Sequence, residues 1–129
     1  MKFDQIKILS FEQFQVIPLN KYNMKKKVCV IGAGLSGLCT IKELAEQGLD
    51  VVCYEAEESF GGAFNMGNES FSKAYSQMRL TVSNYFMAYS SFPPVKDEER
   101  RYWTATEYIN YLDAYIRFFK LDQYIHYSH

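Results

Sequence analysis

The sequence lacks several features that would assign it to common functional classes. Its 129 residues include 14 basic and 15 acidic side chains, so it has no excess of positive charge for binding nucleic acid or an anionic membrane. No apolar run approaches the about 18 residues needed to span a bilayer. Charged residues such as Asp4 and Glu12 interrupt the N-terminus, where a signal peptide needs a continuous apolar segment. We therefore expect a cytoplasmic protein without a nucleic-acid partner or a membrane segment.

Cysteine is also scarce. Cys29, Cys39 and Cys53 show no C-x-x-C spacing and lie within apolar runs. This pattern argues against a zinc site or a disulfide framework, and we expect buried thiols and no metal. Apolar residues, in contrast, make up 48% of the chain, with 11 Tyr and 10 Phe, which is enough to build the core of one globular domain.

The first part of the chain differs from the rest. Residues 1–23 show no sustained hydrophobic period, whereas Met24 and three lysines lead directly into an apolar run at residues 28–31. We interpret residues 1–23 as an N-terminal extension and residues 24–129 as a partial nucleotide-binding domain.

The residues from 28 to 54 follow a strand-helix-strand pattern. Residues 28–31 form a continuous apolar run, which is typical of a strand covered on both faces in a parallel sheet. Apolar residues then recur at helical spacing from Leu38 to Ala45, and Gly48 is placed to end that helix. Residues 51–54 form the next apolar run. The fold class is therefore predicted to be α/β, with a Rossmann-like β-α-β unit.

A long irregular section follows Glu55, and the helical period returns only at Thr104. Thr104 and Glu107 have the spacing of a capping box, and the helix behind them presents an apolar face. Residues 125–128 resemble the start of a third strand, after which the chain stops at His129. We expect a parallel sheet that is incomplete at the C-terminus, and a chain that is a fragment.

A glycine fingerprint connects the first strand to the first helix. Residues 32–37 read G-A-G-L-S-G, which matches G-x-G-x-x-G, and Glu55 follows Gly34 by 21 residues at the end of the second strand. In this motif Gly32 allows the tight turn, Gly34 lets a pyrophosphate approach the backbone, and Gly37 lets the helix pack on the strand. The helix N-terminus adds unpaired N–H groups and a partial positive charge. The pattern predicts a dinucleotide diphosphate at this turn.

Glu55 defines the adjoining ribose. Its carboxylate is able to accept hydrogen bonds from both ribose hydroxyls and would repel a 2′-phosphate, and no basic residue accompanies it at positions 56–58. The sequence therefore predicts an adenosine with a free ribose diol, as in FAD or NAD.

Residues 55–64 resemble the acidic strand end and Gly-Gly element of flavoproteins that have two dinucleotide-binding domains. Disulfide reductases of this group have a cysteine pair after the glycines, which is missing here, and amine oxidases usually have Arg where this chain has Ala63. Phe64 fits the aromatic position of flavin-containing monooxygenases.

The resemblance to flavin-containing monooxygenases continues through residues 28–128. Residues 80–93 are similar to a family stretch with a polar, flavin-proximal segment followed by a Met-Ala-Phe-Ser-x-Phe-Pro-like sequence, and residues 107–115 resemble the helix that follows. Thr81 occupies the position where the family often has Asn, and Asn84 follows three residues later.

The resemblance implies the N-terminal FAD-binding part of a monooxygenase in which NADPH reduces FAD and dioxygen oxygenates a soft nitrogen or sulfur atom of a small-molecule substrate. It implies no catalytic side chain in this chain. A site for NADPH is expected in downstream sequence, so residues 1–129 alone are expected to be inactive. Two alternatives stay open, namely an FAD-dependent oxidase or dehydrogenase of another branch, and a truncated, non-catalytic nucleotide-binding fragment. The residues assigned to the cofactor are Gly32, Ala33, Gly34, Ser36, Gly37, Glu55, Gly62, Phe64 and Thr81.

Overall fold

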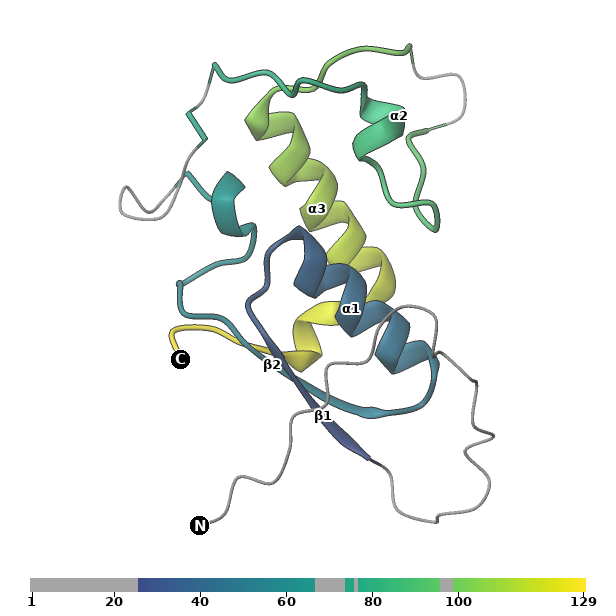
Figure 1. Ribbon diagram of the computed structural model, residues 1–129, viewed down its shortest axis with the longest axis vertical. Coiled ribbons are helices and arrows are strands. Elements are labelled where there is room, and N and C mark those ends of the chain that lie inside the picture. The colour runs from purple at the N-terminus through teal and green to yellow at the C-terminus, as the bar shows by residue number, and fades with distance from the viewer. Residues whose placement is uncertain (1–25, 67–73, 76, 96–98) are drawn as a thin grey trace, which may run out of the picture.

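The computed structural model describes residues 26–66, 74–75, 77–95 and 99–129 (Figure 1). The predicted extension, residues 1–23, lies outside the described residues. Three strands and a set of helices alternate along the chain. In order they are β1 (Lys27–Ile31), α1 (Leu35–Glu46), β2 (Asp50–Tyr54), the 3-10 helix η3 (Gly62–Phe64), α2 (Asn84–Met87), α3 (Ala105–Phe119), the 3-10 helix η4 (Leu121–Tyr124) and β3 (Ile125–His126).

The strands form one parallel sheet in the order β1-β2-β3. β1 and β2 pair over their whole length, from Lys27 opposite Asp50 to Ile31 opposite Tyr54. This arrangement confirms the predicted α/β class and its β-α-β unit. β3 is shorter than the expected residues 125–128 because β2 ends at Tyr54, so the ladder has no further partner residues. Beyond the ladder, the N–H groups of Ser128 and His129 donate to the carbonyls of Glu57 and Glu55, each at 3.0 Å.

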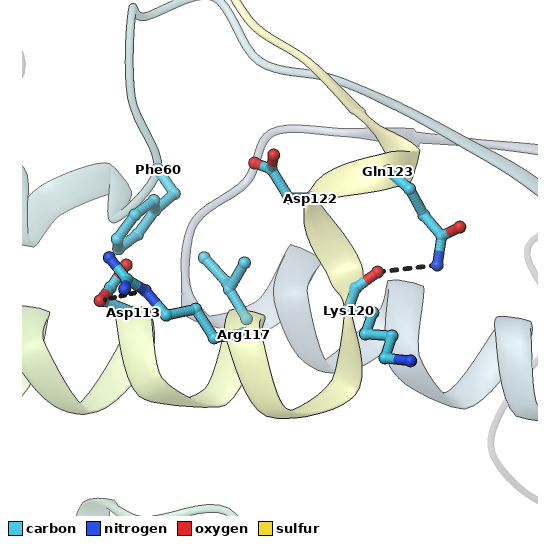
Figure 2. A pocket seen from close by; sticks show the side chains of 7 residues that line it. Phe60, Asp113, Arg117, Lys120, Asp122 and Gln123 are labelled. Carbon is cyan, nitrogen blue, oxygen red and sulfur yellow. Dashed lines mark hydrogen bonds and ion pairs between the residues drawn. The ribbon is translucent and has the colours of Figure 1, made fainter.

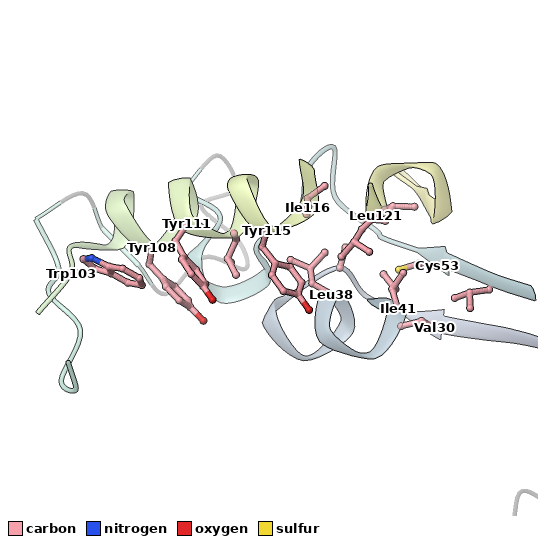
Figure 3. Packing of buried hydrophobic residues seen from close by; sticks show 14 of the residues in the cluster. Val30, Leu38, Ile41, Cys53, Trp103, Tyr108, Tyr111, Tyr115, Ile116 and Leu121 are labelled. Carbon is pink, nitrogen blue, oxygen red and sulfur yellow. The ribbon is translucent and has the colours of Figure 1, made fainter. Parts of the chain in front are cut away.

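α1 packs on one face of the sheet, η4 contacts β2, and α3 packs against α1 and η4. α1 contributes Leu38 and Ile41 to the core and ends at Glu46, with Gly48 in the left-handed conformation (φ 73°) just beyond it, as predicted. α3 contributes a row of aromatic side chains, among them Tyr108 and Tyr115, that extends the core away from the sheet (Figure 3).

α3 begins with the predicted capping box. The Thr104 hydroxyl accepts the Glu107 N–H at 3.2 Å, and the Glu107 carboxylate accepts the Thr104 N–H at 2.8 Å. This backbone hydrogen bond, together with the Arg101 guanidinium 2.6 Å away, holds the pKa of Glu107 below its usual range. Trp103 is buried immediately before the cap, where its ring centroid lies 4.9 Å from that of Tyr111.

The other face of the sheet differs from the sequence prediction. Val30 and Cys53 pack into the core with α1, but Ile31 is 81% exposed and Cys29 is exposed. Successive strand residues point to opposite faces, and in the described part of the chain only the α1 side is covered. The prediction of a strand buried on both faces is therefore wrong for these residues. Buried cysteine is confirmed for Cys53 alone, since Cys39 is only half-buried.

No helix within the described ranges is both long and apolar enough to cross a membrane.

Candidate functional site

The glycine turn, residues 32–37, lies at the carboxyl ends of β1 and β2. The Gly32 N–H donates to the Tyr54 carbonyl at 2.8 Å, which extends the contact between the strands by one residue. The Leu38 N–H donates to the Gly34 carbonyl at 3.0 Å, which is the first hydrogen bond of α1. Gly32, Ala33 and Gly34 therefore form the turn, and Ser36 and Gly37 lie in the first turn of the helix.

Two of the glycines have different surroundings. A Cβ on Gly37 would lie 1.9 Å from the Gly32 carbonyl oxygen, so the close passage of the helix over the turn requires glycine there. A Cβ on Gly34 would lie 3.6 Å from its nearest neighbour, the Cα of Gly62, which is ordinary van der Waals contact, and the φ of Gly34 is −74°. The fold therefore explains glycine at position 37 but not at position 34.

The first turn of α1 has hydrogen-bond donors to spare. Within the described residues, the backbone N–H groups of Leu35, Ser36 and Gly37 have no acceptor, as is usual for the start of a helix. The helix dipole places about half a positive charge at this end. An anionic group that approached Gly34 would meet these donors directly.

Glu55 connects β2 to the glycine turn. It is buried, and its carboxylate accepts the Ala33 N–H at 2.5 Å and the Glu57 N–H at 3.0 Å. Its own N–H donates to the His126 carbonyl of β3 at 2.9 Å, which fixes the backbone. A carboxylate has about four acceptor positions, so two remain for an external donor such as a ribose hydroxyl.

The second glycine element packs on the first. The Gly61 N–H donates to the Ala33 carbonyl at 3.0 Å, and Gly62 lies against Gly34. Phe64 instead packs against α3, with its ring centroid 4.8 Å from that of Tyr108. Thr81 is exposed, and no hydrogen bond between described residues connects it to the glycine turn. The structure thus gathers seven of the nine predicted residues around one turn, and leaves Phe64 and Thr81 outside that cluster.

Asn84 has a structural role that the sequence did not reveal. It is fully buried, its Oδ1 accepts the Arg101 N–H at 3.1 Å, and its Nδ2 donates to the Glu99 carbonyl at 3.2 Å. Asn84, three residues after Thr81, therefore fastens α2 to the segment that leads into α3.

Tyr89 is a second residue that sequence analysis missed. Its hydroxyl donates to the carbonyl of Leu35, in the first turn of α1, at 2.5 Å. One signal in the sequence could have identified it. Tyr89 occupies the position of Phe in the resembling Met-Ala-Phe-Ser stretch, so this chain has a hydroxyl where that stretch has none.

A pocket of about 430 Å³ lies elsewhere, between Phe60 and the C-terminal end of α3 with η4 (Figure 2). None of its lining residues belongs to the glycine turn. Its lining has two cationic side chains, Arg117 and Lys120, and two anionic ones, Asp113 and Asp122. Arg117 is paired with Asp113 at 2.8 Å, so the pocket presents balanced charge and indicates no particular ligand.

Comparison with known proteins identifies the family. A family model described as flavin-binding monooxygenase-like matches residues 25–129. The chain belongs to this family. It is 46% identical over 106 residues to a 4-hydroxybenzoate brominase (decarboxylating) of Marinomonas mediterranea, covering 82% of this chain and 19% of that protein. It is 32% identical over 107 residues to flavin-containing monooxygenase 5 of Mus musculus, covering 81% of this chain and 20% of that protein.

Solved structures of monooxygenases share the fold. An oxidized steroid monooxygenase bound to NADP superposes with a TM-score of 0.67 at 27% identity, over 80% of this chain and 20% of that one. The S-allyl-L-cysteine S-oxygenase of Allium sativum superposes with a TM-score of 0.68 at 23% identity, over 79% of this chain and 27% of that one. The chain spans about a fifth of the length of the curated relatives it matches.

Proposed function

We propose that this chain holds the FAD of an NADPH-dependent monooxygenase that transfers oxygen from dioxygen to a soft nitrogen or sulfur atom of a small molecule. One observation carries the proposal. Position 34 has room for a methyl group within the protein but is glycine, and it lies beside the unpaired N–H groups of α1 and the carboxylate of Glu55. A bound diphosphate explains why that space is left open.

The residues of the site fit the adenosine diphosphate half of FAD. The first turn of α1, with Ser36 and Gly37, would donate backbone N–H groups to the phosphates, in the way that helix N-termini bind phosphate. The remaining acceptor positions of Glu55 would bind the ribose hydroxyls. Gly62, Phe64 and Thr81 are proposed to lie nearer the flavin.

FAD, once bound and reduced by NADPH, supplies the chemistry of oxygen transfer. The residues of this chain bind the cofactor, orient it against the sheet and shield its diphosphate from water. None of them is proposed as a catalytic acid, base or nucleophile. The whole sequence contains a single G-x-G-x-x-G fingerprint, so the NADPH site is proposed to lie outside these 129 residues.

The choice of adenosine ligand tests this proposal. We expect amide signals of residues 32–37 and 55 to shift in NMR titrations with ADP and with FAD. Adenosine 2′,5′-bisphosphate should bind at least several-fold more weakly than AMP, from which it differs only by its 2′-phosphate, because that phosphate would face the buried Glu55 carboxylate. Equal affinities for the two nucleotides, or shifts confined to other residues, would contradict the proposal.

The relatives favour a second candidate for the reaction. Identity to the brominase, 46%, exceeds the 32% to flavin-containing monooxygenase 5, so decarboxylating bromination of a phenolic acid is an alternative to oxygenation of nitrogen or sulfur. A chimera in which residues 24–129 replace the matching segment of the Marinomonas enzyme addresses the shared cofactor role. If this chimera converts 4-hydroxybenzoate, residues 24–129 support the cofactor of the brominase. If instead only a parallel chimera with the mouse enzyme is active, the result favours oxygenation of nitrogen or sulfur.

A further inference from the structure

Tyr89 connects the aromatic core to the glycine turn. It lies in the loop that follows α2, 54 residues beyond Leu35 in the chain, yet its hydroxyl donates to the Leu35 carbonyl at 2.5 Å. A carbonyl oxygen has two lone pairs, so this bond adds to the hydrogen bond that the carbonyl makes within the helix. The contact joins a loop of the aromatic core to the first residue of α1.

Tyr89 is held in place from two directions. Its N–H donates to the hydroxyl of Tyr111 at 2.7 Å, and that hydroxyl donates onward to the Phe92 carbonyl at 2.7 Å. Its ring packs against Tyr115, with centroids 4.4 Å apart. Both partner tyrosines belong to α3, so the position of the Tyr89 hydroxyl is set by the main helix of the core.

The phenol of Tyr89 remains a donor. Burial, reinforced by the neighbouring phenols of Tyr108 and Tyr115, raises the pKa of Tyr89 well above its usual value. The hydroxyl therefore keeps its proton at neutral pH.

The Leu35 carbonyl belongs to the same peptide group as the Ser36 N–H. Hydrogen bonds that share a peptide group polarise one another, so donation to the carbonyl makes the N–H a stronger donor. The Ser36 N–H has no acceptor among the described residues and lies in the turn proposed to bind the phosphates.

We propose that Tyr89 is a positioning residue for the diphosphate, which it serves by holding and polarising the Leu35–Ser36 peptide through its hydroxyl. The inference rests on the proposed function, since it assigns a role toward the same diphosphate. The Tyr89 hydroxyl also distinguishes this chain from the resembling sequences, which have Phe at this position and therefore no hydroxyl.

The test compares Tyr89→Phe with Tyr108→Phe in the 129-residue chain. Tyr108 is a matched control because its hydroxyl is buried in the same aromatic cluster and has no hydrogen-bond partner in the described part of the chain. ADP and adenosine are titrated separately by NMR. We expect Tyr89→Phe to weaken ADP binding by about three- to tenfold, as for loss of one hydrogen bond, and to leave adenosine binding unchanged. Tyr108→Phe should change neither.

A second measurement needs no ligand. In the free protein, Tyr89→Phe should move the Ser36 amide proton upfield, because its peptide loses polarisation, whereas Tyr108→Phe should leave it in place. An unmoved Ser36 signal, unchanged ADP affinity, or equal losses for ADP and adenosine would overturn the inference. So would a Tyr89→Phe protein without a dispersed spectrum, since the hydroxyl would then serve the fold. If the unaltered chain bound neither ADP nor FAD, the proposed function itself would fail.

Discussion

Gly34→Ala separates a requirement of the ligand from a requirement of the fold, and Gly37→Ala is its matched control. The two glycines are three residues apart in the same turn. The Cβ of an alanine at 34 would have 3.6 Å to its nearest neighbour, whereas one at 37 would be 1.9 Å from the Gly32 carbonyl oxygen.

The expected magnitudes follow from these distances. Gly34 has backbone angles that alanine adopts without strain (φ −74°, ψ −178°), so Gly34→Ala should leave stability unchanged or raise it by about 0.4–1 kcal/mol. Its methyl group would displace a phosphate from the first turn of α1. Loss of one charge-assisted hydrogen bond, worth about 1.5–3 kcal/mol, corresponds to about a tenfold or greater loss of affinity. Gly37→Ala forces the helix off the turn and should destabilise the fold by about 1–3 kcal/mol.

Thermal unfolding followed by circular dichroism measures the first effect, and FAD or ADP titration measures the second. The two variants should show opposite patterns, with Gly34→Ala stable but weak in binding, and Gly37→Ala unstable. A Gly34→Ala protein that binds FAD like the parent would show that the diphosphate does not lie at this glycine. A Gly37→Ala protein of unchanged stability would show that the turn is not packed as described.

Three further predictions concern single side chains. Glu55→Ala should weaken FAD binding about tenfold or more in the same titration, because a charged acceptor is lost; unchanged affinity would remove it from the ribose site. The capping hydrogen bond from the Thr104 N–H lowers the pKa of Glu107 in the folded protein. The stability that Glu107 contributes is therefore fully present above its unfolded pKa of about 4.3, and it declines as the pH falls through the lower folded pKa. The melting temperatures of Glu107→Ala and the parent should therefore differ at pH 7 and converge near pH 2; a gap independent of pH would refute this. A thiol reagent should label exposed Cys29 in the native protein but reach Cys53, which is buried with a pKa raised to about 11, only on unfolding.

Local patterns in the sequence determined much of the fold. The glycine turn, the acidic residue at the end of β2, the Gly48 that ends α1 and the capping box at Thr104 are all short-range signals, and the structure has each where it was predicted. Such features depend on the conformations that individual residues favour and on spacings of a few positions, so one sequence is enough to reveal them.

Contacts between distant segments could not be predicted in the same way. The hydrogen bond from Tyr89 to Leu35 spans 54 residues, and that from Asn84 to Arg101 spans 17. Nothing in the composition of either segment indicates its partner. The exposure of Ile31 was not predicted for a related reason. An apolar run indicates that a strand favours burial, but it does not show which other segment covers each face of that strand.

Neighbouring segments bind the peptide groups of the glycine turn, residues 32–37, but leave the N–H groups of the first turn of α1 without an acceptor among the described residues. Three segments that are far apart in the sequence bind its peptide groups: the Glu55 carboxylate accepts the Ala33 N–H, the Gly61 N–H donates to the Ala33 carbonyl, and the Tyr89 hydroxyl donates to the Leu35 carbonyl. None of the three uses the N–H groups of the first helical turn. The turn therefore already has the shape that an anion would need, and binding has little backbone entropy left to lose. Because β2, the Gly-Gly element and the aromatic core each hold the turn, a change in any of them should reach the proposed diphosphate site through this one segment.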